Sequence, residues 1–145
     1  MKKLQDVIIS MEDLIKSDPY FYHKEKLYYT KGLLNELEGN YVEAIENHRK
    51  ALEFDKIALP QLLGLARCYR LNGEIKQARD YMDRALKLFP YAGETRYESA
   101  LIYAENSQMD QAIKEIEKVF DIWLDADADH IKSNEAKLQF AEWKN

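Results

Sequence analysis

Residues 59–92 read LPQLLGLARCYRLNGEIKQARDYMDRALKLFPYA, and this stretch decides the fold. Apolar residues recur at three- and four-residue steps on both sides of Asn72-Gly73, a spacing that places them on one face of each of two helices. Gly73 ends the first helix, because glycine can adopt the left-handed conformation that a helix C-terminus favours. Pro90 ends the second, because its ring and its missing N–H stop a helix. The stretch therefore predicts a helical hairpin.

The same pattern returns every 34 residues along the chain. Small residues align with small residues at this spacing, in the sets Ala44, Ala78 and Ala112; Gly39, Gly73 and Ser107; and Gly32, Ala66 and Ala100. Several aligned columns of this kind indicate a repeat architecture, in which each unit buries its apolar face against the next. The sequence thus predicts three helical hairpins, at residues 25–58, 59–92 and 93–126.

With these residues, the chain resembles the tetratricopeptide repeat family. Residues 59–92 match the family's pattern best, through Ala66, Tyr69, Gly73, Ala78, Ala85 and Pro90. The other two units depart from it, because Lys56 and Leu124 replace the usual proline and Ser107 replaces the usual glycine. Residues 120–127 are also similar to the ends of such arrays in larger bacterial signalling and secretory proteins. The resemblance implies an all-α fold, a right-handed superhelix of helix-turn-helix repeats, forming one domain over residues 1–145.

The segments outside the three repeats predict a cap at each end. Residues 1–24 form an N-terminal half-repeat and an insertion, with a helical stripe made of Leu4, Val7, Ile8, Met11, Leu14 and Ile15 that Asp18-Pro19 ends. In the insertion, Tyr20-Phe21-Tyr22-His23 is interpreted as aromatic packing over this cap, with a contact site as the alternative. We expect residues 127–145 to form a C-terminal capping helix.

Two faces of the C-terminal helix carry apolar residues. Ile131 and Leu138 share one face, while Ala136, Phe140 and Trp143 lie almost opposite. One face can cap the stack, and the other is left over. Phe140 and Trp143 are the candidates for a secondary contact with another molecule, against ordinary exposed residues of a frayed end as the alternative.

Composition excludes several classes of protein. The chain has 145 residues, of which 46% are hydrophobic and 32% charged, so it is neither disordered nor collagen-like. Its net charge of -5, with both signs interspersed, argues against nucleic acid or a membrane surface as the main partner. The single Cys68 cannot form an intramolecular disulfide, and no segment is apolar for long enough to be a signal or to span a membrane. We expect a soluble, cytoplasmic protein.

No motif for metal binding is complete. Asp125, Asp127 and Asp129 have the spacing of the first ligands of an EF-hand, but His130 stands where glycine is needed and Ala136 where glutamate is needed. The acidic run is better interpreted as a favourable helix start. No cysteine and histidine stand at a zinc spacing, so we expect no metal ligands and no cofactor.

Catalytic motifs are equally missing from the sequence. His23, His48 and His130 fall in different units and outside any triad signature. His48 occupies a position between helices that is normally apolar, which favours partly buried packing over catalysis. Cys68 is most simply a small core residue. The chain is therefore predicted not to be an enzyme.

The family resemblance implies that the first helices of successive repeats line a concave groove. Its candidate partner-binding residues are Lys26, Tyr29, Leu33, Leu63, Arg67, Arg70, Tyr97 and Leu101. The clamp by which some members hold a terminal carboxylate is absent, since Tyr29 and Leu33 replace its Lys and Asn. What remains is an aromatic and aliphatic trough that can bury an apolar side chain and pair one acidic group with an arginine.

These features predict a non-catalytic protein-protein interaction module that binds an extended peptide or a helix of a partner protein of unknown identity in its groove. The alternative is a homo-oligomerising structural element whose groove or terminal aromatic face binds a second copy, as in a homodimer; the chain's own first residues could also cover the groove. Arg67 and Arg70 are expected to be exposed, so that reversing both charges abolishes capture without unfolding the protein.

Overall fold

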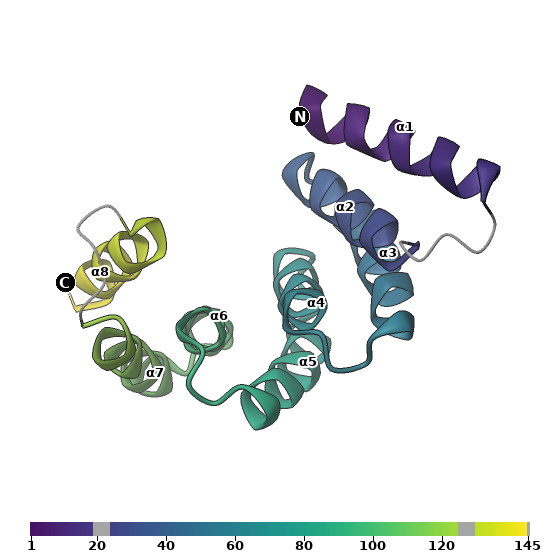
Figure 1. Ribbon diagram of the computed structural model, residues 1–145. Coiled ribbons are helices and arrows are strands. Elements are labelled where there is room, and N and C mark those ends of the chain that lie inside the picture. The colour runs from purple at the N-terminus through teal and green to yellow at the C-terminus, as the bar shows by residue number, and fades with distance from the viewer. Residues whose placement is uncertain (19–23, 125–129, 145) are drawn as a thin grey trace. The chain divides into compact units, whose positions relative to one another are not determined.

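All secondary structure in the residues described by the structure, a computed structural model covering residues 1–18, 24–124 and 130–144, is helical. The helices are α1 (Lys2–Ser17), α2 (Lys24–Leu37), α3 (Tyr41–Phe54), α4 (Leu59–Leu71), α5 (Ile75–Leu88), α6 (Gly93–Glu105), α7 (Met109–Ile122) and α8 (Ile131–Lys144) (Figure 1). The predicted all-α class is confirmed. The predictions for the aromatic insertion at residues 20–23 and the acidic run at 125–129 lie outside the described residues.

The helices pack into two compact units. The first unit, Met1–Glu74, holds α1 to α4: α2 packs on α3, α3 on α4, and α1 on α2, with a further contact between α2 and α4. The second unit, Ile75–Asn145, holds α5 to α8, each packed on the next. The boundary between the units follows the Gly73 turn, inside the predicted repeat 59–92, and the exact repeat boundaries stay a prediction.

Small residues bring the helices together in both units. In the first unit, Ala44 and Ala51 on α3 are fully buried, and in the second Ala112 on α7 is as well. A methyl group at these positions lets neighbouring helix backbones approach closely, which a larger side chain would prevent. Longer apolar residues one or two turns away fill the remaining space, as Ile116 does on α7.

The turns that follow α2, α4 and α6 repeat one backbone geometry. Gly39, Gly73 and Ser107 have φ angles of 77°, 80° and 59°. Each N–H donates to the carbonyl three residues earlier, and the next residue's N–H donates to the carbonyl five residues earlier, at 2.8–3.1 Å. These bonds satisfy carbonyls that a helix end leaves unpaired. The alignment of these three positions therefore reflects a shared need for the left-handed conformation.

Replacing Ser107 with glycine is expected to stabilise the chain by about 0.5–1 kcal/mol, because a side chain at positive φ costs about 1–2 kcal/mol and part of this gain is offset by the freer unfolded chain. Thermal unfolding of the variant should shift to higher temperature. The matched change Gly73→Ala should shift it downward; an unchanged or lower midpoint for Ser107→Gly would contradict the interpretation.

At the N-terminus, only part of the predicted apolar stripe is covered. Ile8 is buried against the first unit, but Val7 and Leu14 are 45% and 48% exposed. An ion pair of 2.5 Å joins Lys31 Nζ on α2 to Glu12 on α1. The helix α1 thus packs on α2 through a narrower face than its sequence predicts.

At the C-terminus, the structure reverses the expected roles of the two apolar faces of α8. Phe140 and Trp143 are half-buried and pack on a core that includes Ala136 and Ile116, and the Phe140 ring meets Phe120 edge-on at 5.2 Å between centroids. The expectation that these two aromatic residues form the open contact face is therefore wrong. The exposed face carries Ile131 and Leu138, at 71% and 69% exposure. The small Ala136 favours burial of its own face, since a small residue lets α8 approach α7 closely.

Candidate functional site

Five of the predicted groove residues belong to α2 and α4 of the first unit, two helices that contact one another. We call this surface the α2/α4 face and define it by Lys26, Tyr29, Leu33, Leu63 and Arg67. Lys26 is exposed and Tyr29 and Leu33 are half-buried, while Leu63 is buried. Two further candidates, Tyr97 and Leu101, belong to the second unit, where they are half-buried on α6.

The remaining candidate, Arg70, is buried rather than exposed. The prediction that it is exposed is wrong, because only 9% of the residue is exposed, near the end of α4. Most residues of α4 are buried, so this helix has less exposed surface than an amphipathic helix with one face in solvent. Reversing the charge of Arg70 would leave an anion in a buried place and would test folding rather than binding.

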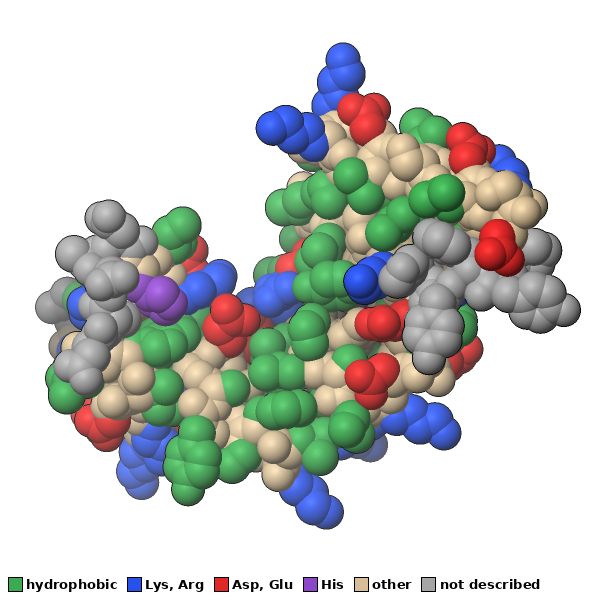
Figure 2. Space-filling view, in the orientation of Figure 1, with side chains coloured by type: hydrophobic (Ala, Val, Ile, Leu, Met, Phe, Trp, Pro, Cys, Tyr) green, Lys and Arg blue, Asp and Glu red, His purple; other side chains and the backbone are tan. Residues whose placement is uncertain are grey.

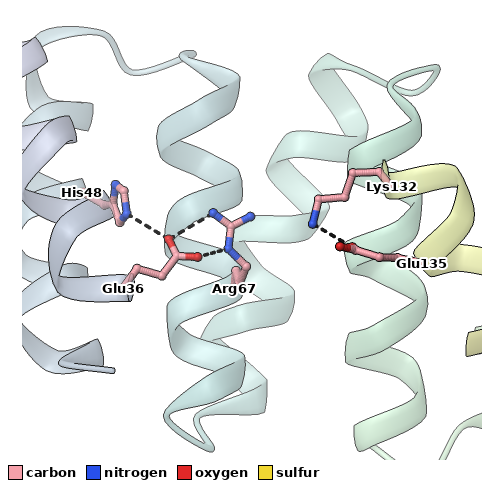
Figure 3. A network of polar contacts seen from close by, with 5 residues as sticks. All are labelled: Glu36, His48, Arg67, Lys132 and Glu135. Atoms are coloured by element: carbon pink, nitrogen blue, oxygen red, sulfur yellow. Dashed lines mark hydrogen bonds and ion pairs between the residues drawn. The ribbon is translucent and has the colours of Figure 1, made fainter. Parts of the chain in front are cut away.

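Arg67 is engaged within the chain. Its Nη2 donates to Glu36 Oε2 at 3.0 Å, and its Nε donates to Glu36 Oε1, so the guanidinium and the carboxylate form a two-bonded pair between α4 and α2 (Figure 3). Such forked pairs fix geometry as well as charge. Because Glu36 already neutralises this arginine, the α2/α4 face presents Lys26 rather than Arg67 as its exposed cation.

Next to this pair lies His48 of α3, which is fully buried. Its Nε2 is 3.7 Å from Glu36 Oε2, an ion-pair distance too long for a hydrogen bond (Figure 3). The imidazole ring is held between Gly32 of α2 and Gly64 of α4, where an added Cβ would lie 2.7–2.9 Å from ring atoms on both sides. The predicted packing role of His48 is confirmed, and its burial is complete rather than partial.

The residues around Glu36 lower the pKa of its carboxyl group. Burial by itself would raise the pKa of the Glu36 carboxyl, but His48 and the Arg67 guanidinium outweigh that effect and lower the pKa from 4.5 to about 2. Glu36 therefore stays ionised throughout the neutral and mildly acidic range, and the pair persists there. Sequence reasoning missed this pairing, because Glu36 and Arg67 lie on different helices.

The lowered pKa predicts a loss of stability in acid. A carboxyl whose folded pKa is about 2 contributes fully to stability above its unfolded pKa of 4.5, and loses that contribution as the pH falls toward 2. The difference corresponds to about 3 kcal/mol. Urea unfolding between pH 6 and pH 2 should show a smaller decline in Glu36→Gln than in the unchanged chain. The exposed Glu46 provides the matched control Glu46→Gln; equal declines in all three proteins would exclude this account.

The surface of the first unit combines apolar and charged groups. In the view of Figure 2, hydrophobic and charged side chains are interspersed over the elements of this unit. The exposed large hydrophobic residues of this unit include Val7, Ile9, Leu14, Leu37, Val42, Phe54 and Ile57. Among the residues that the structure describes, every helix is too short or too polar to span a bilayer.

Comparison with known proteins gives one family and several relatives. A family model described as tetratricopeptide repeat matches residues 37–87. The photosystem I assembly protein Ycf3 of Prochlorococcus marinus is 30% identical over 125 residues, 81% of this chain and 70% of that protein. The Ycf3 protein of Acaryochloris marina is 30% identical over 106 residues, and there the match spans 68% of this chain and 63% of the relative. More than a third of the Acaryochloris marina protein therefore lies outside the part that this chain matches.

Solved structures share the fold at low sequence identity. The type III secretion translocator chaperone SycD of Yersinia enterocolitica has a TM-score of 0.75 at 12% identity, covering 83% of this chain and 91% of that one. PcrH in complex with the chaperone-binding region of PopD has a TM-score of 0.72 at 14% identity, covering 82% and 90%. The first repeat domain of Spaghetti (RPAP3) bound to an HSP90 peptide has a TM-score of 0.70 at 16% identity, covering 84% and 91%. Two of these three structures contain a bound segment of another protein.

Proposed function

Because this chain belongs to the tetratricopeptide repeat family, we propose that it is a non-catalytic protein-interaction module whose α2/α4 face binds an extended segment or a helix of a partner protein. The observation that carries this proposal is the set of side chains on α2. Lys26, Tyr29 and Leu33 follow one another at three- and four-residue steps, so they lie along one side of the helix. All three retain exposed surface.

The chemistry of this face favours a partner segment that carries both an apolar and an acidic side chain. Tyr29 and Leu33 offer partly exposed aromatic and aliphatic surface, which gains free energy when a partner side chain covers it. Lys26 offers an exposed ammonium group about one turn away. The Glu36–Arg67 pair joins α2 to α4, and the buried His48 of α3 lies next to it, so that the side chains of the face are positioned before binding.

The relatives support the coarse class of function. PcrH and Spaghetti (RPAP3) are seen with a bound region of PopD and an HSP90 peptide, respectively. The Ycf3 relatives are described as assembly proteins. We propose for this chain the general role of a binding module or assembly factor, with Tyr97 and Leu101 on α6 as further candidate contacts. The buried single Cys68 and the mixed surface charges favour a cytoplasmic location as part of this proposal.

Reversing the charge of Lys26 and truncating Leu33 is expected to weaken partner capture at least about tenfold, since a few central residues carry most of the energy of an interface. Both residues retain exposed surface, so Lys26→Glu with Leu33→Ala should leave the helix content unchanged. The test is a pull-down from an extract of the protein's own cells, quantified by mass spectrometry for each variant.

Arg49 on α3 supplies the matched control for that experiment. It is exposed, and Arg49→Glu changes the net charge by the same amount as Lys26→Glu. The proposal expects the same proteins to be captured by Arg49→Glu and by the unchanged chain, and lost from the α2 double variant. Equal capture by both variants would remove the α2/α4 face from the function.

A homo-oligomer is the second candidate function, favoured by the exposed Ile131 and Leu138 on α8. An apolar face of this kind can bind its equivalent on a second copy around a two-fold axis. Light scattering across a range of concentrations distinguishes the two roles. A monomer at all concentrations would exclude the oligomer, and a dimer that captures no other protein would favour it.

A further inference from the structure

Three ligand-type side chains from three different helices meet inside the first unit. Glu36 of α2, His48 of α3 and Cys68 of α4 place a carboxylate oxygen, a ring nitrogen and a thiol sulfur within 4.8 Å of one another. His48 and Cys68 are fully buried, and the Glu36 side chain is 15% exposed. Sequence spacing could not reveal this cluster, because its members are separated by 12 and 20 residues and belong to no linear motif.

The second observation is the state of the His48 imidazole. Among the residues that the structure describes, neither Nδ1 nor Nε2 finds a hydrogen-bond partner, although the side chain is fully buried. A buried polar group left without a partner costs about 1–3 kcal/mol, so such groups are rare and call for an explanation. Gly32 and Gly64 pack closely against the two faces of the ring, and its Nε2 faces Glu36. A bound cation is one partner that would satisfy this nitrogen.

We propose that Glu36, His48 and Cys68 form a binding site for a single divalent transition-metal ion, with zinc as the ion that this ligand set suits best. Thiolate sulfur, imidazole nitrogen and carboxylate oxygen are the three ligand types that zinc takes in proteins, at about 2.0–2.3 Å. A tetrahedral site with such bonds keeps its ligand atoms roughly 3.4–3.7 Å apart, so the cluster has to contract by about 1–1.5 Å. Water would take the fourth position.

Arg67 orients the Glu36 carboxylate beside this site. Its Nε donates to Glu36 Oε1 and its Nη2 donates to Oε2 at 3.0 Å, and Oε2 is also the oxygen that lies 3.7 Å from His48 Nε2. Coordination through Oε2 takes that oxygen from Nη2 and leaves the bond from Nε to Oε1 in place, and ligating carboxylates are commonly oriented by such a neighbour. The Arg67 charge also offsets the two anionic ligands, the Glu36 carboxylate and the Cys68 thiolate. Binding releases the thiol proton of Cys68 to solvent, which makes the affinity fall in acid.

Cobalt titration of the full chain, with the thiol kept reduced, tests the proposal. Cys68 is the single cysteine of the chain, so a near-ultraviolet thiolate-to-cobalt charge-transfer band can arise only from its sulfur. The expected result is one Co²⁺ per chain with this band, displaced by Zn²⁺. At about a hundredfold excess over its dissociation constant, Zn²⁺ should raise the unfolding midpoint by about 5 °C or more.

Variants locate the ion. Cys68→Ser should abolish the band, and both Cys68→Ser and His48→Gln should weaken Co²⁺ binding by more than about 100-fold. His130→Gln, in the second unit, is the matched control and should bind as the unchanged chain does. The absence of the band in the unchanged chain, or unchanged affinity in a folded Cys68→Ser variant, would overturn the proposal. If His48→Gln does not fold, the band and the Cys68→Ser result decide the question by themselves.

Discussion

Alanine at Gly32 is expected to destabilise the chain by about 2–3 kcal/mol, and alanine at Gly64 by a similar amount. Each added methyl group would lie 2.7–2.9 Å from atoms of the buried His48 ring, closer than non-bonded atoms tolerate. The ring cannot move away, because it is held from the opposite side by the other glycine. Overpacking of this kind costs about 1–3 kcal/mol in protein cores. Urea unfolding at neutral pH measures the change.

The direction of the stability change in Gly32→Ala tests whether the glycine packs against His48. In an ordinary helix interior, changing glycine to alanine stabilises by about 0.5–1 kcal/mol. Once His48→Ala has removed the ring, Gly32→Ala should therefore become neutral or stabilising. A double-mutant cycle should give a coupling of about 2–3 kcal/mol between the two positions. A Gly32→Ala variant that is more stable than the unchanged chain would show that His48 is not held in this way.

Truncation of Phe140 is expected to destabilise the second unit by about 2–3 kcal/mol, since a fully buried phenylalanine costs about 3–5 kcal/mol and this one is half-buried. Its ring packs edge-on against Phe120 of α7, so Phe140→Ala loosens α8 from the unit. Thermal unfolding followed by circular dichroism measures the loss.

The control for Phe140→Ala lies on the opposite face of the same helix. Leu138 is 69% exposed, and Leu138→Ala should change stability by less than about 0.5 kcal/mol. If Phe140→Ala instead leaves the midpoint unchanged and shifts a dimer to monomer, Phe140 faces another molecule, and the packing of α8 described above is wrong.

Helical periodicity and turn chemistry were sufficient to predict much of the fold. The glycines at positions 39 and 73 and the serine at 107 mark the same left-handed turn, as the spacing of 34 residues indicates. The resemblance drawn from Ala66, Gly73 and Pro90 led to the correct family. These features are local, and each is set by residues within one or two turns of a helix.

The features that the sequence did not reveal depend on which side chains meet across helices. The pairing of Arg67 with Glu36, and the approach of Cys68 to His48, join residues that no periodic pattern connects. Both faces of α8 carry large apolar residues, so periodicity alone could not show which one is covered. The glycines on both sides of His48 were the available signal, since an interior helix glycine often marks a close approach.

Site-specific photocrosslinking tests the proposed binding face most directly. A photoreactive residue at position 33, on the α2/α4 face, is compared in the protein's own cell extract with one at position 49, on α3. The account predicts crosslinks from position 33 to one continuous segment of a different protein, reduced at least about tenfold by Lys26→Glu and absent from position 49. Equal crosslinking from both positions, or products that contain only a second copy of this chain, would contradict it.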